Sequence, residues 1–131
     1  MAKYLLDTNI CISLLKDKYG VRGKVLDVSF EKCYVSEVTI AELYYGAAKS
    51  NRPEHFDDVD NIKGMFKVLP MYPSLKLYGK LKAELEQKGL RLDDFDLLIG
   101  ATSIVNKMTM VTSNTRHFER IPGIRLEDWA K

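Results

Sequence analysis

The stretch Tyr4-Leu5-Leu6-Asp7-Thr8-Asn9-Ile10-Cys11-Ile12-Ser13-Leu14-Leu15 decides the fold, because a short apolar run changes here into a helical pattern. Tyr4 to Leu6 is short and apolar, as expected for a strand. Asp7, Thr8 and Asn9 supply turn and helix-capping chemistry, and the apolar residues after them continue as a helix. The stretch therefore predicts a strand that passes directly into a helix.

The same alternation continues along the chain. Further strands are predicted over residues 33–35, 66–69, 108–112 and 124–126. Further helices are predicted over 21–30, after a cap at Ser36 or Thr39, after Pro53, from Ser74 to Gly89, and over 96–107. Strands separated by helical crossovers imply a mostly parallel sheet with helices on both faces. We therefore predict an α/β fold, a three-layer α/β/α domain over residues 1–131 with a central sheet of about four to five strands.

Composition narrows the class of protein. With 131 residues, 46% hydrophobic and 29% charged, the chain is expected to form one soluble domain with one core. No window approaches the roughly 18 apolar residues of a membrane span, so we expect a cytoplasmic protein without a membrane partner. Cys11 and Cys33 lie in apolar segments without a CxxC pair, which predicts reduced core residues. A net charge of +2 is compatible with nucleic acid and decides nothing by itself.

Three carboxylates stand where apolar segments meet the starts of predicted helices. Asp7 follows the first predicted strand, Glu42 follows the second strand by one helical turn, and Asp96 opens the helix that feeds the strand ending at Thr112. Asn114 follows that same strand. In parallel sheets ligands bind beyond the carboxyl ends of the strands, where the strand order reverses. We therefore expect these four oxygen-bearing side chains to meet at one edge of the sheet.

Such a cluster suits a hard cation. Mg²⁺ and Mn²⁺ prefer oxygen ligands and usually keep several waters. Without a cation, clustered carboxylates repel one another and the pKa of at least one rises. A metal held in this way can activate water and stabilise the oxygens of an in-line displacement at phosphorus. The cluster therefore predicts phosphodiester hydrolysis.

Four segments, in chain order, resemble the four motifs of the PIN-domain nucleases: Leu5-Leu6-Asp7-Thr8-Asn9, Thr39-Ile40-Ala41-Glu42-Leu43, Asp96-Leu97-Leu98-Ile99-Gly100-Ala101, and Val111-Thr112-Ser113-Asn114-Thr115-Arg116-His117-Phe118. The closing stretch from Arg120 to Trp129 is similar to the tail of the VapC toxins in that family. Each motif alone is weak, but four in register plus the tail form a specific signature. The resemblance covers essentially the whole chain.

The resemblance implies a PIN-like fold and a Mg²⁺- or Mn²⁺-dependent endoribonuclease, the toxin of a type II toxin–antitoxin pair. It also implies a homodimer that a VapB-like antitoxin holds inactive, as a heterotetramer or larger assembly. Carried over by position, Asp7, Glu42 and Asp96 become metal ligands, and Asn114 takes the fourth catalytic position. Many family members carry an acid at the position of Asn114, and some carry one at that of His117. We therefore predict one tightly bound ion, with any second arriving with RNA.

Side chains near the motifs are expected to orient ligands or to contact RNA: Thr8, Asn9, Asp94, Thr112, Ser113, Arg116 and His117. Each assignment has a structural alternative. Asp7 can cap a helix, and Glu42 and Asp96 can complement a helix dipole, typically worth about 0.3–1 kcal/mol. His117 can act as a general acid, contact phosphate or be a simple surface group. The basic residues Arg91, Lys49 and Arg52 can contact RNA phosphates or only solvate the surface.

Two other functional classes stay open from the sequence. A binding-only module that kept the fold and lost turnover is suggested by Asn114 and His117. A phosphohydrolase or phosphoacceptor built on Asp7 is disfavoured, because haloacid-dehalogenase-type enzymes need an acid two residues later, where this chain has Asn9. No P-loop, dinucleotide-binding or HExxH motif occurs.

Overall fold

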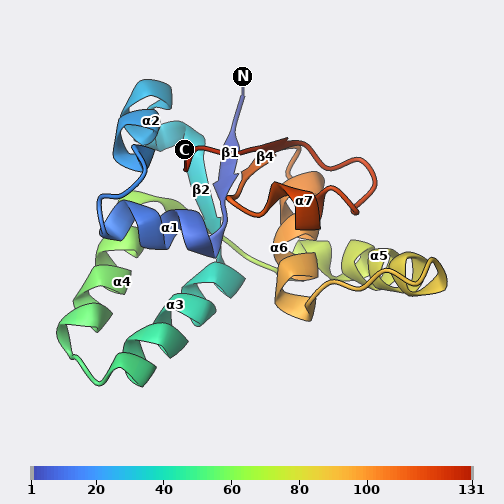
Figure 1. Cartoon of the computed structure of the whole chain (residues 1–131), viewed down its shortest axis with the longest axis horizontal. Coiled ribbons are helices and arrows are strands. Elements are labelled where there is room, and N and C mark those ends of the chain that lie inside the picture. Colours follow the sequence, from blue (N-terminus) through green and yellow to red (C-terminus); the bar gives the residue numbers. More distant parts are fainter. Residues whose placement is uncertain (1, 131) are drawn as a thin grey trace.

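Five short strands form one parallel sheet in the computed structural model, which describes residues 2–130 (Figure 1). The strands are β1 (Tyr4–Leu6), β2 (Cys33–Ser36), β3 (Lys67–Leu69), β4 (Thr109–Val111) and β5 (Leu126–Glu127). Their order in the sheet is β3-β2-β1-β4-β5, and each neighbouring pair is parallel. The predicted α/β class with a central parallel sheet is confirmed.

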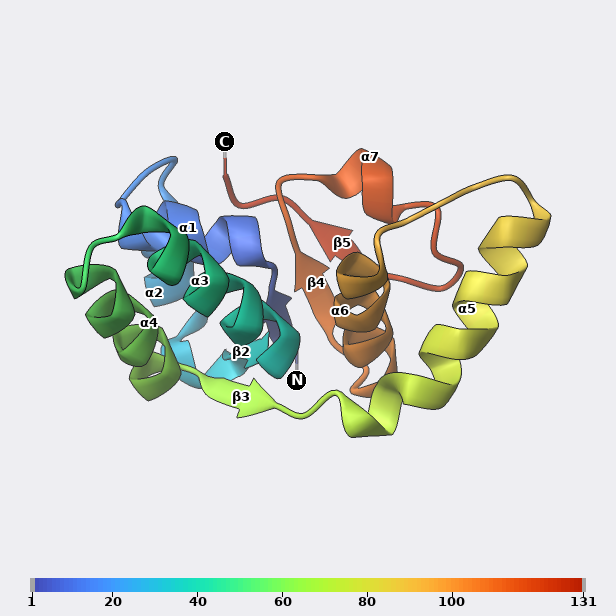
Figure 2. The ribbon, with the colours of Figure 1, turned by 90° about the horizontal axis from the view of Figure 1, so that it is seen from below.

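Helices cover both faces of this sheet, as Figure 2 shows. They are α1 (Thr8–Leu15), α2 (Val21–Val28), α3 (Glu37–Ser50), α4 (Glu54–Met65), α5 (Leu75–Gln87), α6 (Asp94–Val105) and α7 (Thr115–Phe118), with 3-10 turns at Phe30–Lys32 and Tyr72–Ser74. Successive strand residues face opposite sides. Leu6 joins a core with residues of α1 to α4, and Leu5 joins a second core with residues of α5 to α7. This arrangement gives the three predicted layers.

The order in which strands are added to the sheet reverses at β1. The first crossovers step from β1 to β2 and then to β3, after which α5 and α6 return the chain to β4 on the other side of β1. The carboxyl ends of β1 and β4 are thus neighbours that lead into helices on opposite faces. The backbone N–H of Asp7 donates to the carbonyl of Val111 across 2.9 Å and ties these two ends together. A crevice at such a reversal is the usual ligand site of open α/β sheets.

One predicted helix is shorter than expected. The helical pattern over 21–30 predicts a continuous helix, but α2 ends at Val28. Ser29 has a φ of 87°, which no helix interior tolerates, and the 3-10 turn Phe30–Lys32 follows it. Ser74 also differs from its predicted capping role, because its hydroxyl donates to the carbonyl of Met71 instead.

Two differences lie near the predicted site. Helix α6 begins at Asp94, two residues before the expected start, so Asp96 lies inside the first turn rather than opening the helix. Helix α7 was not predicted. It is one turn long, and the carbonyl of Asn114 accepts hydrogen bonds from the backbone N–H groups of His117 and Phe118. These backbone bonds fix the direction in which α7 leaves β4.

The two cysteines behave as predicted, since Cys11 and Cys33 are free and buried. Burial raises the pKa of the Cys33 thiol to about 11, and it raises the pKa of Cys11 further above its ordinary value. Both thiols therefore stay protonated at neutral pH. Within residues 2–130 no helix is both long and apolar enough to cross a membrane.

Candidate active site

Asp7 lies at the end of β1, with only 4% of its surface exposed. One carboxylate oxygen, Oδ1, accepts the backbone N–H of Thr8 across 2.8 Å. The other, Oδ2, accepts the hydroxyl of Thr112 across 2.8 Å and the amide of Asn9 across 3.2 Å. Burial raises the pKa of Asp7, and these hydrogen bonds oppose the rise. Asp7 is also the N-cap of α1, so the same carboxylate begins a helix and occupies the site.

Glu42 reaches the site through a hydroxyl. It lies in the second turn of α3, half-buried, and its Oε1 accepts the Thr8 hydroxyl across 2.6 Å. The Thr8 oxygen also lies 3.2 Å from Oγ1 of Thr39. Because Thr8 has one hydroxyl proton, which the shorter contact to Glu42 uses, Thr39 is the donor in the longer contact. The sequence predicts only a capping role for Thr39, which Ser36 takes instead, although Thr39 stands three residues before Glu42 on the same helix face.

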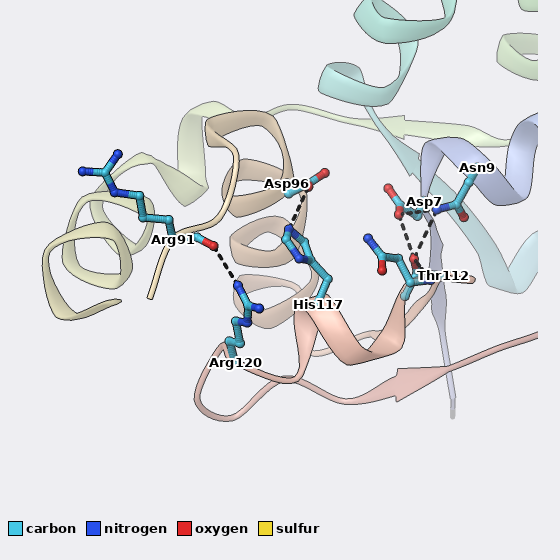
Figure 3. A network of polar contacts seen from close by, with 8 residues as sticks. Asp7, Asn9, Arg91, Asp96, Thr112, His117 and Arg120 are labelled. Carbon is cyan, nitrogen blue, oxygen red and sulfur yellow. Dashed lines mark hydrogen bonds and ion pairs between the residues drawn. The ribbon is translucent and has the colours of Figure 1, made fainter. Parts of the chain in front are cut away.

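Asp96 approaches from the other face of the sheet, in the first turn of α6. Burial, followed by the negative charges of Asp7, Asp93 and Glu42, raises its pKa from the ordinary 3.8 to about 6. Its Oδ2 lies 3.8 Å from Nε2 of His117, and Figure 3 shows the imidazole pointing from α7 toward this carboxylate. His117 is thus the nearest cationic group to Asp96 when it is protonated.

The turn between β4 and α7 is fixed against the beginning of α1. Thr112 is fully buried, and while its hydroxyl donates to Asp7 it accepts the backbone N–H of Asn114 across 3.0 Å. Oδ1 of Asn9 accepts the backbone N–H of Ser113 across 3.2 Å. Figure 3 shows Asn9 and Thr112 together beside the Asp7 carboxylate, with the Asn9 amide 3.5 Å from the Thr112 hydroxyl. Asn114 follows Ser113 directly and is exposed.

One predicted residue, Asp94, bonds outside this group. The carboxylate of Asp94 accepts the hydroxyl of Tyr78 across 2.8 Å and the ammonium of Lys82 across 2.9 Å, both from α5. The bond from Lys82, and next that from Tyr78, lowers the pKa of Asp94. Asp94 therefore holds the start of α6 to α5. Arg116 is exposed on α7.

The donor chemistry fits a hard cation, although the direct ligand set stays a prediction. Glu42 raises the pKa of Asp7, and Asp7 and Glu42 both raise the pKa of Asp96. These three carboxylates are thus near enough to repel one another. Among residues 2–130, however, no group of three or more His, Cys, Asp or Glu side chains is gathered closely enough to hold a metal ion. Mg²⁺ needs only one or two direct carboxylates, because waters complete its shell.

Comparison with known proteins identifies the class. Residues 4–124 match the PIN domain, so the chain belongs to the PIN domain family. Its relatives in that family are VapC ribonucleases. The tRNA(fMet)-specific endonuclease VapC of Salmonella typhimurium is 36% identical, over 98% of this chain and 99% of that protein. Ribonuclease VapC2 of Rickettsia felis is 35% identical, over 98% of each chain.

Solved structures agree with this assignment. The DNA-bound VapBC complex of Salmonella typhimurium contains a chain that superposes with a TM-score of 0.91 and 36% identity, covering 98% of this chain and 99% of that one. VapBC2 of Rickettsia felis, bound to a promoter DNA fragment, matches with a TM-score of 0.87 and 34% identity, covering 96% and 98%. The predicted PIN-like fold is thereby confirmed.

Proposed function

We propose that this chain is a metal-dependent endoribonuclease, the toxin of a type II toxin–antitoxin pair that a VapB-like antitoxin neutralises. The observation that carries the proposal is that Thr112 of the β4 end bonds to Asp7 at the end of β1, while Glu42 accepts the hydroxyl of the adjacent Thr8. The charges of Asp7 and Glu42 also contribute to the raised pKa of Asp96. The relatives support the activity, since they are named as ribonucleases or endonucleases. The solved VapBC complexes support the antitoxin as partner.

The reaction is hydrolysis of an RNA phosphodiester bond. Asp7, Glu42 and Asp96 are the residues that would hold a Mg²⁺ or Mn²⁺ ion, which would lower the pKa of a bound water and offset negative charge on the phosphate oxygens. Asp7 is the fixed member of the group, because three donors orient its carboxylate before any ligand arrives. The Thr8 hydroxyl orients Glu42 by donating to its carboxylate. Asp96, in the first turn of α6, adds a third carboxylate. A carboxylate whose pKa rises through repulsion becomes fully ionised when a cation binds beside it.

Asn114 sets the expected stoichiometry. Its amide offers an oxygen but no negative charge, so the site is proposed to hold one ion firmly and a second only with RNA. Calorimetric titration with Mn²⁺ tests this directly. Two tight sites without RNA would contradict it.

The decisive experiment compares RNA cleavage by the parent with that by Asp7→Asn and Asp96→Asn, in Mg²⁺ and in Mn²⁺. Each variant should lose activity by on the order of 100-fold or more, since removing even an outer partner of a metal site costs about 10–100-fold. Asp94→Asn is the matched control, because Asp94 is bonded to α5 instead of the site. Undiminished cleavage by both site variants would remove the proposed metal site.

The toxin role has its own test. Expression of the chain in the cytoplasm of a bacterial host should arrest growth. The substitution Asp7→Asn, or co-expression of the VapB-like partner, should relieve the arrest. The alternative function is a binding module of weak activity. It is favoured by Asn114, where many family members carry an acid, and by His117, where some do. Growth arrest that persists in Asp7→Asn would favour this second reading. Sedimentation of the purified chain tests the proposed homodimer and its larger complex with the antitoxin.

A further inference from the structure

Two arginines extend the site beyond the Asp96–His117 pair. Nη1 of Arg120 donates to the backbone carbonyl of Arg91 across 3.0 Å. This bond joins the segment after α7 to the loop between α5 and α6. Figure 3 shows these residues in order outward from Asp7: His117 with Asp96, then Arg120, and finally Arg91, whose guanidinium points away from the carboxylates. We call Arg91 and Arg120 the arginine pair.

The positive charge of the arginine pair is available to a ligand. Both side chains are exposed, and none of the ion pairs formed within residues 2–130 involves Arg91, Arg116 or Arg120. A guanidinium has five N–H donors, and the bond to the Arg91 carbonyl uses one of those on Arg120. The pair lines an open hollow of about 590 Å³ together with Gly89 and Glu86. Glu86 is the one acid lining this hollow.

A polyanion that approaches the three carboxylates is repelled by them, so it needs positive charge nearby in order to bind. RNA carries one negative charge per phosphate, and Asp7, Glu42 and Asp96 repel it wherever a cation does not offset them. Guanidinium groups bind phosphate oxygens with two parallel hydrogen bonds, which fixes both position and direction. The bond to the Arg91 carbonyl already restricts the Arg120 side chain, so less conformational entropy is lost when a phosphate binds.

We propose that the arginine pair grips the RNA backbone on the Asp96 side of the cleavage site. This rests on the proposed function and deepens it by assigning the path of the substrate. RNA is favoured over an acidic protein because the arginine pair continues the row of site residues. Phosphate contacts carry affinity and register but read no base. Arg120 and Arg91 are thus positioning residues for any RNA sequence.

The test measures how RNA binding depends on salt. A fluorescent single-stranded RNA is titrated with protein in an Asp7→Asn background with Mg²⁺, between about 50 and 200 mM NaCl. For single strands the slope of log affinity against log salt changes by about 0.7 for each phosphate contact. Arg120→Gln and Arg91→Gln should each flatten the slope by about that amount. Arg120→Lys should keep the slope, because it keeps the charge.

Arg125 provides a matched control. Its Nη2 donates to the backbone carbonyl of Lys107 across 3.0 Å, the same kind of bond, but at the amino end of β4 and so away from the crevice. Arg125→Gln should leave the salt slope unchanged. Glu86→Gln should strengthen RNA binding, since it removes the acid from the hollow. Far-ultraviolet circular dichroism checks that each variant is folded.

Three outcomes would overturn the proposal. The first is an Arg120→Gln slope equal to that of the background. The second is an equal effect of Arg125→Gln. The third is an unchanged RNA slope with weakened binding of a polyglutamate peptide, which would assign the arginine pair to an acidic protein partner. Failure of the proposed function looks different, because the parent would then cleave no RNA or the Asp7→Asn background would cleave it fully.

Discussion

Asp96→Asn should make the metal-free protein more stable at neutral pH while it removes the site's response to a cation. The reason is electrostatic. Asp96 is partly buried beside Asp7, Asp93 and Glu42, and its pKa rises from 3.8 to about 6. A carboxylate with a raised pKa favours unfolding wherever it is ionised, because the unfolded chain ionises it at lower cost. The neutral amide of asparagine carries no such penalty.

The magnitude follows from the two pKa values. A pKa difference of one corresponds to about 1.4 kcal/mol, so the rise from 3.8 to about 6 costs the folded state about 3 kcal/mol above pH 6. The substitution also removes a favourable helix-dipole interaction of about 0.3–1 kcal/mol in the first turn of α6. The burial penalty exceeds this loss. We therefore expect Asp96→Asn to raise the free energy of unfolding by about 2 kcal/mol in EDTA at pH 7.

Urea unfolding at several pH values is the assay. The destabilising contribution of Asp96 is absent below pH 3.8 and grows as the pH rises toward 6, so the parent and Asp96→Asn should differ at pH 7 and converge near pH 4. Saturating Mg²⁺ should stabilise the parent by about 2.7 kcal/mol at a hundredfold excess over its Kd, and the variant far less. The variant Asp94→Asn should not be more stable than the parent, because the bonds from Lys82 and Tyr78 lower the pKa of the Asp94 carboxyl in the parent. An Asp96→Asn protein no more stable than the parent in EDTA at pH 7 would refute the reasoning.

Three further substitutions test the packing around the site. Thr112→Val should cost about 1–3 kcal/mol of stability and about 10–100-fold in Mn²⁺ affinity, measured by calorimetry, because it removes one of the three donors to the Asp7 carboxylate and leaves the Asn114 N–H without its acceptor. Thr112→Ser should behave like the parent. Thr8→Val should lower RNA cleavage by about 10–100-fold by releasing Glu42, and an effect equally large in Thr8→Ser would argue against this. Gly100→Val should lower the free energy of unfolding by about 1–3 kcal/mol, since an added Cβ would lie 2.8 Å from Cδ1 of Ile121. Thermal unfolding measures this loss, and an unchanged midpoint would contradict the prediction.

The sequence predicted the parts of the site that depend on strand ends. The apolar run before Asp7 and the one before Asn114 each predict a strand, and parallel pairing brings such ends together. The contact between Asp7 and Thr112 therefore follows from topology, although 105 residues separate them.

Other features depend on contacts that no local pattern encodes. Helix α7 has four residues, too few to show a helical period, and backbone bonds to Asn114 define it. Asp94 stood two residues from Asp96 and so was predicted to support the site, but Tyr78 and Lys82 of α5 take its carboxylate. The break at Ser29 is a backbone conformation that its side chain does not favour.

Because Asp7 caps α1 and also belongs to the candidate site, folding and the proposed cleavage both constrain the same side chain. Asparagine caps helices about as well as aspartate, whereas alanine does so poorly. If cleavage is no longer required, the cap of α1 still restricts position 7 to aspartate, asparagine or serine, and less favourably to threonine or glycine. In an inactive variant of this chain, position 7 should therefore keep a capping residue, a constraint that the positions of Glu42 and Asp96 do not share.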